Sequence, residues 1–246
     1  MFDNGLPYSK PYELCSLERC GRGLSSRAIP RGEICPIKFS YNIPKLLRET
    51  VCEALGQEEG DILAERAVDL GCGSGQSGAQ FRQYVKHLSG VDLSPEMAEE
   101  ARESSFYDRI IVGDAECALR EETHYGQEER TCYDFFFACD LFPYVGDLQP
   151  IFQMVRKGLK GRGSLAFSVE LLDESLDESK EEDEGDPGFV MQSCARFAHK
   201  RWYITQLCKE FGFHELLKKE STVLRQHRSK DVLGALVVLE LSPLAV

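Results

Sequence analysis

The feature that most constrains the fold is a run of glycines directly after a short apolar segment. The sequence VDLGCGSGQSG, residues 68–78, has glycine at four of its positions. Glycine adopts positive backbone angles without steric cost and lets a ligand approach the main chain closely. Such a turn between a buried strand and a helix is typical of sheets that bind a ligand at their carboxyl edge. The sequence therefore predicts a ligand-binding turn here.

Segments of strand and helix character alternate along the chain. Strands are predicted at 66–71, 88–94, 109–114, 133–142 and 163–171, and helices at 43–55, 77–88, 95–104, 146–159 and 199–212. The last two strand-like runs, 213–225 and 231–241, are joined by QHRSK, which permits an antiparallel hairpin but no parallel crossover. We therefore expect an α/β fold: a doubly wound, Rossmann-like sheet of seven strands with a C-terminal antiparallel β-hairpin.

The length fits one such domain with less regular segments attached. The chain has 246 residues, of which 42% are hydrophobic and 28% charged. Residues 1–38 show no clear period and are predicted to form an N-terminal arm or lid, ahead of a domain over 39–246. Residues 173–186 hold nine acids and one lysine. We predict a solvated acidic insertion there, with the steering of a cationic substrate as the alternative.

Charge, apolar runs and cysteine spacing bear on the class of partner. The formal net charge is −12 without a basic stripe, so no nucleic acid partner is expected. No apolar run reaches 18 residues, so no membrane span is expected. The ten cysteines lack zinc-like spacing, so no metal site is predicted. We expect a cytoplasmic protein, with an organellar targeting segment near the N-terminus as the alternative.

The glycine run fits two cofactor patterns. Its last three glycines form the G-x-G-x-x-G of dinucleotide sites, and its first three, led by Asp69, form D-x-G-x-G-x-G. Asp92, at the end of the next predicted strand, suits the ribose of either cofactor. Asp69 favours the second pattern, because a carboxylate repels a pyrophosphate and attracts an ammonium or a sulfonium. The loop therefore indicates S-adenosylmethionine.

Taken in order, the motifs resemble those of class I S-adenosylmethionine-dependent methyltransferases over roughly residues 39–241. The matching stretches are VDLGCGSG, LSGVDLSPEM, IIVGDAE, YDFFFACDLFPYVGDL, GLKGRGSLAFSVE and the closing hairpin. Within this class the chain is most similar to a family of predicted methyltransferases, some of which carry tetratricopeptide repeats that are absent here. The resemblance implies S-adenosylmethionine as cofactor and S-adenosylhomocysteine as its product.

The resemblance also implies a role for residues at the ends of the first four strands. It assigns the methionine part of the cofactor to Asp69, Gly71, Cys72, Gly73 and Gly75, the ribose to Asp92, the adenine to Leu93, Asp114 and Ala115, and the methyl group to the surroundings of Ala138.

Candidates for the substrate side follow the fourth and fifth strands. An oxygen or carbon nucleophile usually needs a base, and His199 is predicted as that base because histidine titrates near neutral pH. Arg196 is predicted to bind a substrate carboxylate or phosphate. Tyr144 is a candidate for the pocket lining and Asp140 for a second base. The structural alternatives are a helix start for His199, a salt bridge for Arg196, packing for Tyr144 and a turn for Asp140.

We expect an enzyme that transfers a methyl group to an O, N or C atom of a small molecule. A protein methyltransferase is an alternative, although no asparagine-proline-proline-tyrosine motif follows the fourth strand. A regulatory or assembly protein that binds the cofactor without turnover is a second alternative. An oxidoreductase that uses a dinucleotide is a third.

Overall fold

The computed structural model describes residues 42–58, 60–115, 117, 133–172, 185–227 and 230–242. The predicted N-terminal arm, 1–38, and nearly all of the acidic insertion, 173–186, lie outside the described residues. Both therefore stay predictions.

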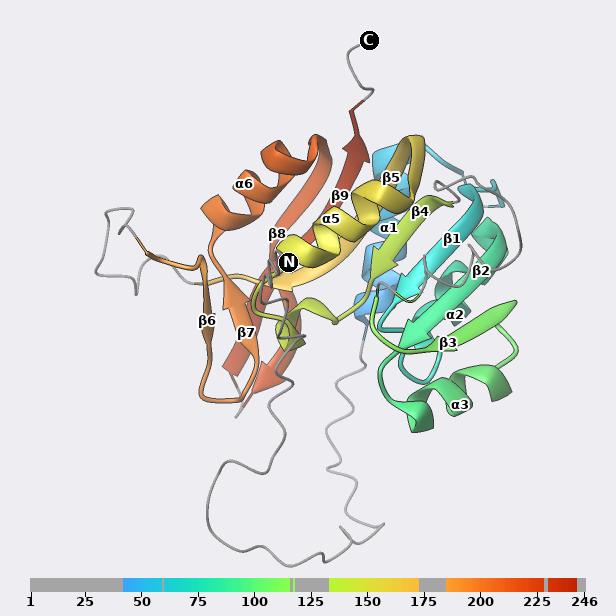
Figure 1. Ribbon diagram of the computed structural model, residues 1–246, viewed down its shortest axis with the longest axis horizontal. Coiled ribbons are helices and arrows are strands. Elements are labelled where there is room, and N and C mark those ends of the chain that lie inside the picture. The colour runs from blue at the N-terminus through green and yellow to red at the C-terminus, as the bar shows by residue number, and fades with distance from the viewer. Residues whose placement is uncertain are drawn as a thin grey trace, which may run out of the picture. The chain divides into compact units, whose positions relative to one another are not determined.

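A seven-stranded sheet organises the described chain, in the order β3-β2-β1-β4-β5-β9-β8 (Figure 1). Its strands are β1 (Ala64–Leu70), β2 (Val85–Asp92), β3 (Arg109–Val112), β4 (Tyr133–Ala138), β5 (Leu159–Glu170), β8 (Phe213–His227) and β9 (Lys230–Leu241). β1 to β5 are parallel, and β9 runs antiparallel to both β5 and β8. The predicted doubly wound sheet with one reversed strand is confirmed.

Helices cover both faces of the sheet. They are α1 (Ile43–Leu55), α2 (Gln76–Phe81), α3 (Pro95–Glu103), α5 (Gln149–Gly158) and α6 (Arg201–Phe211), with short 3₁₀ turns η2 (Arg82–Tyr84) and η4 (Phe142–Tyr144). α5 and α6 pack on one face in a core that contains Phe152 and Leu207, and α1 and α2 pack on the other through Leu47 and Phe81. None of the described helices is both long and apolar enough to cross a membrane.

A separate hairpin lies beside the carboxyl edge of the sheet. Its strands, β6 (Phe189–Met191) and β7 (Phe197–His199), pair antiparallel with each other. It packs on the segment after β4 at Gly146, where an added Cβ would lie 2.6 Å from the Phe189 ring and 3.0 Å from the Phe197 ring. Leu172 N–H also donates to the His199 carbonyl at 2.9 Å. The hairpin is thereby fixed next to the ends of β4 and β5.

Strand pairing explains the changed bounds of two predicted helices. The helix expected over 77–88 is shorter: α2 and η2 together end at Tyr84, because Val85 already pairs with Ala64 in the sheet. The helix expected over 199–212 begins at Arg201, because the three residues before Lys200 pair with β6.

Two predicted strands differ from the structure by four residues at one end. The strand expected over 133–142 ends at Ala138, because Asp140 has a φ of 58°, which no strand adopts. The strand expected over 163–171 begins earlier, at Leu159, and includes a register shift where it pairs with β4.

The edge strand β8 is irregular. Its pairing with β9 shifts register between Glu215 and Leu217, between Lys219 and Thr222, and between Val223 and Arg225. Such shifts bend a strand and increase its twist. The last of them sets which face of the sheet the Arg225 side chain occupies.

Candidate active site

The turn after β1 has the backbone conformation that its glycines predict. Gly71, Gly73 and Gly75 have φ angles of 69°, 52° and 95°, in the left-handed region that other residues rarely adopt. Among the described residues, no atom beyond its two chain neighbours lies within 4 Å of a Cβ placed on Gly73, so the main chain there borders open space. The conformation follows the D-x-G-x-G-x-G pattern at each glycine.

Gly78 has a different reason to be glycine. It is absent from the described glycines with positive φ, and an added Cβ would lie 2.4 Å from the Tyr107 ring. Its N–H donates to the Tyr107 hydroxyl at 3.0 Å. Gly78 therefore allows α2 to pack on Tyr107, which accounts for the last glycine of the G-x-G-x-x-G pattern without a dinucleotide.

Asp69 lies near the end of β1 and is completely buried. The hydroxyls of Ser77 and Tyr107 both donate to Oδ2, the latter at 2.7 Å, and Oδ1 has no hydrogen-bond partner among the described residues. Burial raises the pKa of Asp69 to about 7. The sequence predicted a charged carboxylate beside the loop, whereas burial of this enclosed group favours its protonated form.

Asp92 connects the end of β2 to the glycine turn. Its Oδ2 accepts the Gly73 N–H at 2.9 Å, and its Oδ1 accepts the Ser94 N–H at 2.9 Å. Each carboxylate oxygen keeps a further lone pair that can accept a ligand hydroxyl. The next residue, Leu93, is 48% exposed and offers an apolar surface beside it.

The other predicted cofactor residues lie at the same edge. In the sheet Leu70 is opposite Val91, and Asp92 is opposite Val112, so β1, β2 and β3 end side by side. Asp114 follows β3 and accepts the Cys117 N–H at 3.1 Å. The remaining positions are half-buried Ala115 and the buried residues Cys72 and Ala138.

Asp140 follows β4 directly beside the glycine turn. Its N–H donates to the Ser168 hydroxyl oxygen at 2.9 Å, which supports its positive φ. The next residue, Leu141, packs on Gly71, where an added Cβ would lie 2.9 Å from Leu141 Cδ1. Burial raises the pKa of the Asp140 carboxyl above its ordinary value, against the lowering effect of Arg196.

Three of the predicted substrate-side residues meet in one cluster. Arg196 donates from Nη2 to Asp140 Oδ1 and from Nη1 to the Tyr144 hydroxyl at 2.9 Å. The Arg196 guanidinium carbon also lies 4.6 Å from the centre of the Tyr144 ring, within cation–π range. The salt-bridge alternative for Arg196 therefore describes its geometry, and Tyr144 remains 55% exposed.

Glu170, the last residue of β5, joins Arg196 to a second arginine, Arg225, and was not among the predicted site residues. Its Oε1 accepts Arg196 Nε at 2.9 Å and Arg225 Nε at 2.7 Å, and its Oε2 accepts Arg225 Nη2 at 3.1 Å. Glu170 is 2% exposed. An acid that ends a continuous apolar strand was the available signal, because a buried carboxylate requires partners.

His199 conflicts with its predicted role as the base. It ends β7, is completely buried, and lies with Nε2 at 3.1 Å from the Val145 carbonyl and 2.9 Å from the Gly146 carbonyl. Nδ1 has no partner among the described residues, and burial lowers the pKa of His199 to about 4. A base must reach the proton of its substrate, and this ring is enclosed. The alternative of a helix start is also wrong, because the residue belongs to a strand.

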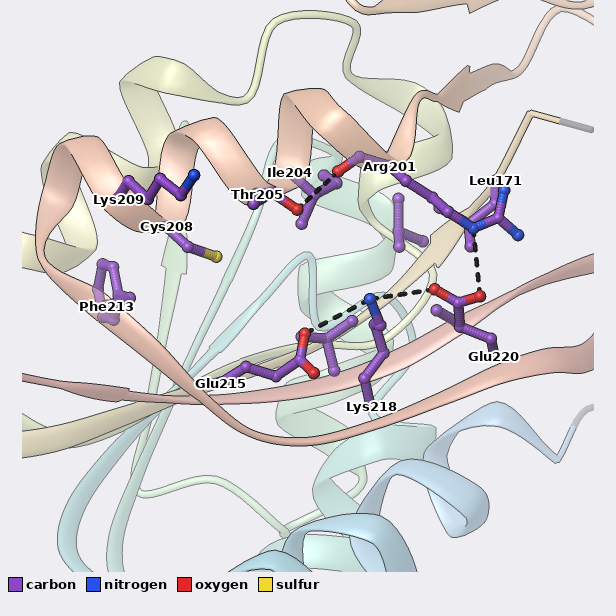
Figure 2. Close-up of a pocket in the computed structure, with 13 residues that line it drawn as sticks. Leu171, Arg201, Ile204, Thr205, Cys208, Lys209, Phe213, Glu215, Lys218 and Glu220 are labelled. Atoms are coloured by element: carbon purple, nitrogen blue, oxygen red, sulfur yellow. Dashed lines mark hydrogen bonds and ion pairs between the residues drawn. The ribbon is translucent and has the colours of Figure 1, made fainter. Parts of the chain in front are cut away.

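A recess with a volume of about 200 Å³ lies between α6 and β8 (Figure 2). Lys218 lies across it with Nζ at 3.6 Å from Glu215 and 3.1 Å from Glu220, and Arg201 Nε pairs with Glu220 at 3.2 Å. None of its lining residues belongs to the glycine turn or to the arginine cluster, which consists of Asp140, Tyr144, Glu170, Arg196 and Arg225. The recess is therefore separate from the candidate site. Within the described part of the chain, no three His, Cys, Asp or Glu residues are grouped to hold a metal ion.

Comparison with protein families matches residues 68–167 to a family described as a methyltransferase domain. Among curated proteins, a malonyl-[acyl-carrier protein] O-methyltransferase from Pectobacterium atrosepticum is 30% identical over 119 residues. The match covers 46% of this chain and 41% of that protein, so the chain spans less than half the length of this relative.

Solved structures share the fold. A SAM-dependent methyltransferase from Methanosarcina mazei superposes with a TM-score of 0.54 at 16% identity, covering 75% of this chain and 94% of that one. The magnesium protoporphyrin IX methyltransferase from Synechocystis PCC 6803, solved with bound SAM, gives a TM-score of 0.52 at 14% identity, covering 81% and 79%.

Proposed function

We propose that this chain, which has the fold of class I S-adenosylmethionine-dependent methyltransferases, is an enzyme that methylates an O, N or C atom of a small molecule. The observation that carries the proposal is the turn at 71–75, which has three glycines of positive φ and lies against Asp92 of the neighbouring strand. A methyltransferase domain matched over 68–167 supports the same reading. The cofactor is S-adenosylmethionine, which leaves as S-adenosylhomocysteine.

The residues at this edge fit that cofactor. The open space beside Gly73 accommodates a ligand close to the main chain. Asp92 has lone pairs left for two ribose hydroxyls, and exposed Leu93 offers an apolar surface for a base. Asp114, at the end of the next strand, is suited to a hydrogen bond from an amino group.

The cofactor supplies a methyl group made electrophilic by a sulfonium. The chain has to hold the acceptor in line with that methyl, which is mainly a matter of positioning. Asp140, Tyr144 and Arg196 form the wall that faces the acceptor, because they follow β4 or are bound to a residue that does.

His199 acts as a positioning residue in this scheme. Its neutral ring donates from Nε2 to the carbonyls of Val145 and Gly146, directly after Tyr144. It thereby fixes the segment that carries the Tyr144 ring. It has no hydrogen bond of its own to Asp140, Tyr144 or Arg196 among the described residues.

Calorimetry tests the cofactor assignment. We expect binding of S-adenosylmethionine and S-adenosylhomocysteine and none of NAD or NADH, with a large loss of affinity in Asp92→Ala. Asp61→Ala is the matched control, because Asp61 also accepts a backbone N–H, that of Glu58, but lies in an exposed turn. Tight NAD binding without a response to S-adenosylmethionine would falsify the proposal.

A second measurement separates an enzyme from a protein that only binds the cofactor. Formation of S-adenosylhomocysteine is followed by mass spectrometry across a library of metabolites. We expect turnover that depends on the added acceptor and carries the methyl group into it.

A further inference from the structure

The charges of the arginine cluster are balanced among themselves. Two guanidiniums, those of Arg196 and Arg225, meet two carboxylates, those of Glu170 and Asp140. The side chains of Arg196 and Glu170 are 13% and 3% exposed, so the pairing is shielded from water. A negatively charged acceptor would have to displace one of these carboxylates and leave it buried without a partner, which is strongly unfavourable.

The unused hydrogen-bonding capacity of the cluster lies on Asp140. Its Oδ1 accepts from Arg196, whereas Oδ2 accepts no hydrogen bond from any other described residue. The Asp140 side chain is 18% exposed, so part of this carboxyl is accessible to a ligand. An ionised carboxylate oxygen only accepts, and its natural partner is an N–H or O–H group.

The position of Asp140 places this oxygen next to the cofactor turn. Its N–H is held by Ser168, and the adjacent Leu141 packs on Gly71. The carboxyl therefore lies at the border between the turn at 71–75 and the acceptor wall, where the nucleophile has to meet the methyl group.

We infer that the methyl acceptor presents a proton-bearing nitrogen or hydroxyl to Oδ2 of Asp140, and that carboxylates are not acceptors. The inference rests on the proposed function. The acceptor nitrogen or oxygen forms the new bond to the methyl carbon, the carbon–sulfur bond breaks with its electrons left on sulfur, and the acceptor proton goes to Asp140 Oδ2. Asp140 is then a catalytic residue, and Ser168 and Arg196 are positioning residues for it.

The test compares matched acceptors of one size. Benzylamine, benzyl alcohol and phenol are set against benzoate, and hexylamine and hexanol against hexanoate, with products identified by mass spectrometry. We expect turnover only among the amines, alcohols and phenol. Turnover of a carboxylate, or no turnover in the whole amine and hydroxyl series, overturns the inference.

The variant Asp140→Asn tests the role of the carboxylate itself. Asparagine tolerates a positive φ, keeps the shape of the side chain and has an amide oxygen that can still accept from Arg196. Loss of the base should lower kcat by about 10²- to 10⁴-fold. With benzyl alcohol as the acceptor, which does not ionise in this range, the wild type should lose kcat/KM as the pH falls and Asp140 becomes protonated, whereas the residual activity of Asp140→Asn should lack that dependence. Unchanged kcat in the variant overturns the inference.

Cofactor affinity keeps this failure distinct from failure of the proposed function. Calorimetry with S-adenosylhomocysteine should give the same dissociation constant for the wild type and Asp140→Asn. If neither protein binds the cofactor, the proposed function fails. If both bind it and the acceptor series behaves otherwise than stated, only the inference about the acceptor fails.

Discussion

The two halves of the carboxyl edge are built by different means. On the cofactor side, main-chain conformation and short-range bonds dominate: Asp92 binds the N–H groups of Ser94 and Gly73, 2 and 19 positions away. On the acceptor side, side chains from distant segments meet: Glu170 binds Arg196 and Arg225, 26 and 55 positions away. The first half is therefore specified locally, and the second depends on the whole fold.

The largest expected loss in the free energy of unfolding comes from a substitution in the arginine cluster. Glu170→Ala leaves the Arg196 and Arg225 guanidiniums without their shared carboxylate. Loss of one partner of a buried pair costs about 3–5 kcal/mol in the free energy of unfolding. Urea denaturation measures it. The exposed pair of Lys86 with Glu65 is the control, since Glu65→Ala should cost less than about 1 kcal/mol. Equal costs would remove the contrast between buried and exposed pairs.

A smaller effect is expected on the cofactor side. Gly73→Ala places a Cβ in the open space and imposes a φ of 52° on alanine. We expect affinity for S-adenosylhomocysteine to fall at least tenfold, together with about 1–2 kcal/mol of strain.

Gly56→Ala is the matched control for that variant. Gly56 ends α1 with a φ of 62° and likewise has no atom near an added Cβ. It should show the same loss in the free energy of unfolding with unchanged cofactor affinity. If both variants lose affinity equally, the turn has no special role.

One titrating group on each side of the edge should respond to pH with opposite sign. The pKa of buried Asp69 is raised from its ordinary 3.8 to about 7, so the folded state binds more protons and stability falls as pH rises between these values. The pKa of His199 is lowered from 6.5 to about 4, so stability falls as pH decreases across that range.

Between pH 5 and 6 these two effects oppose each other in the wild type. In Asp69→Asn the slope of the free energy of unfolding against pH should be more positive than in the wild type, by about 1.4 kcal/mol per pH unit. In His199→Gln the same slope should be more negative than in the wild type by about as much. Urea denaturation at the two pH values gives both slopes. Identical slopes in all three proteins would contradict the burial of these groups.

The smallest effect is expected outside both halves. Lys218→Met, in the recess between α6 and β8, removes ion pairs with Glu215 and Glu220 whose side chains are all partly exposed. Such pairs contribute about 0–1 kcal/mol. Turnover and cofactor affinity should be unchanged, and a loss of either would extend the site to this recess.

The sequence predicted the glycine turn and the order of the sheet because each signal is local. A φ of 52° at Gly73 admits little but glycine, and the alternation of strands and helices sets the order of the sheet. The burial and the raised pKa of Asp69 were not predictable in the same way. Its burial depends on Tyr107, which comes from 38 positions further along the chain.

The acceptor side was predicted only in part, again for a physical reason. Asp140, Tyr144 and Arg196 were found as separate candidates, but Glu170, the buried carboxylate that binds Arg196, looked like the end of a strand. Arg225 reaches it through a register shift in β8 that no short pattern encodes. His199 was assigned to a helix because a three-residue strand is too short to show a period.

The irregular pairing of β8 has a consequence for aggregation in concentrated solution. An edge strand offers unpaired N–H and C=O groups to which a strand of another molecule can add. Three register shifts and alternating charges at Glu215, Lys218 and Glu220 make β8 a poor template for that addition. The same shift that brings Arg225 to Glu170 therefore also makes this border of the sheet a poorer site for strand addition.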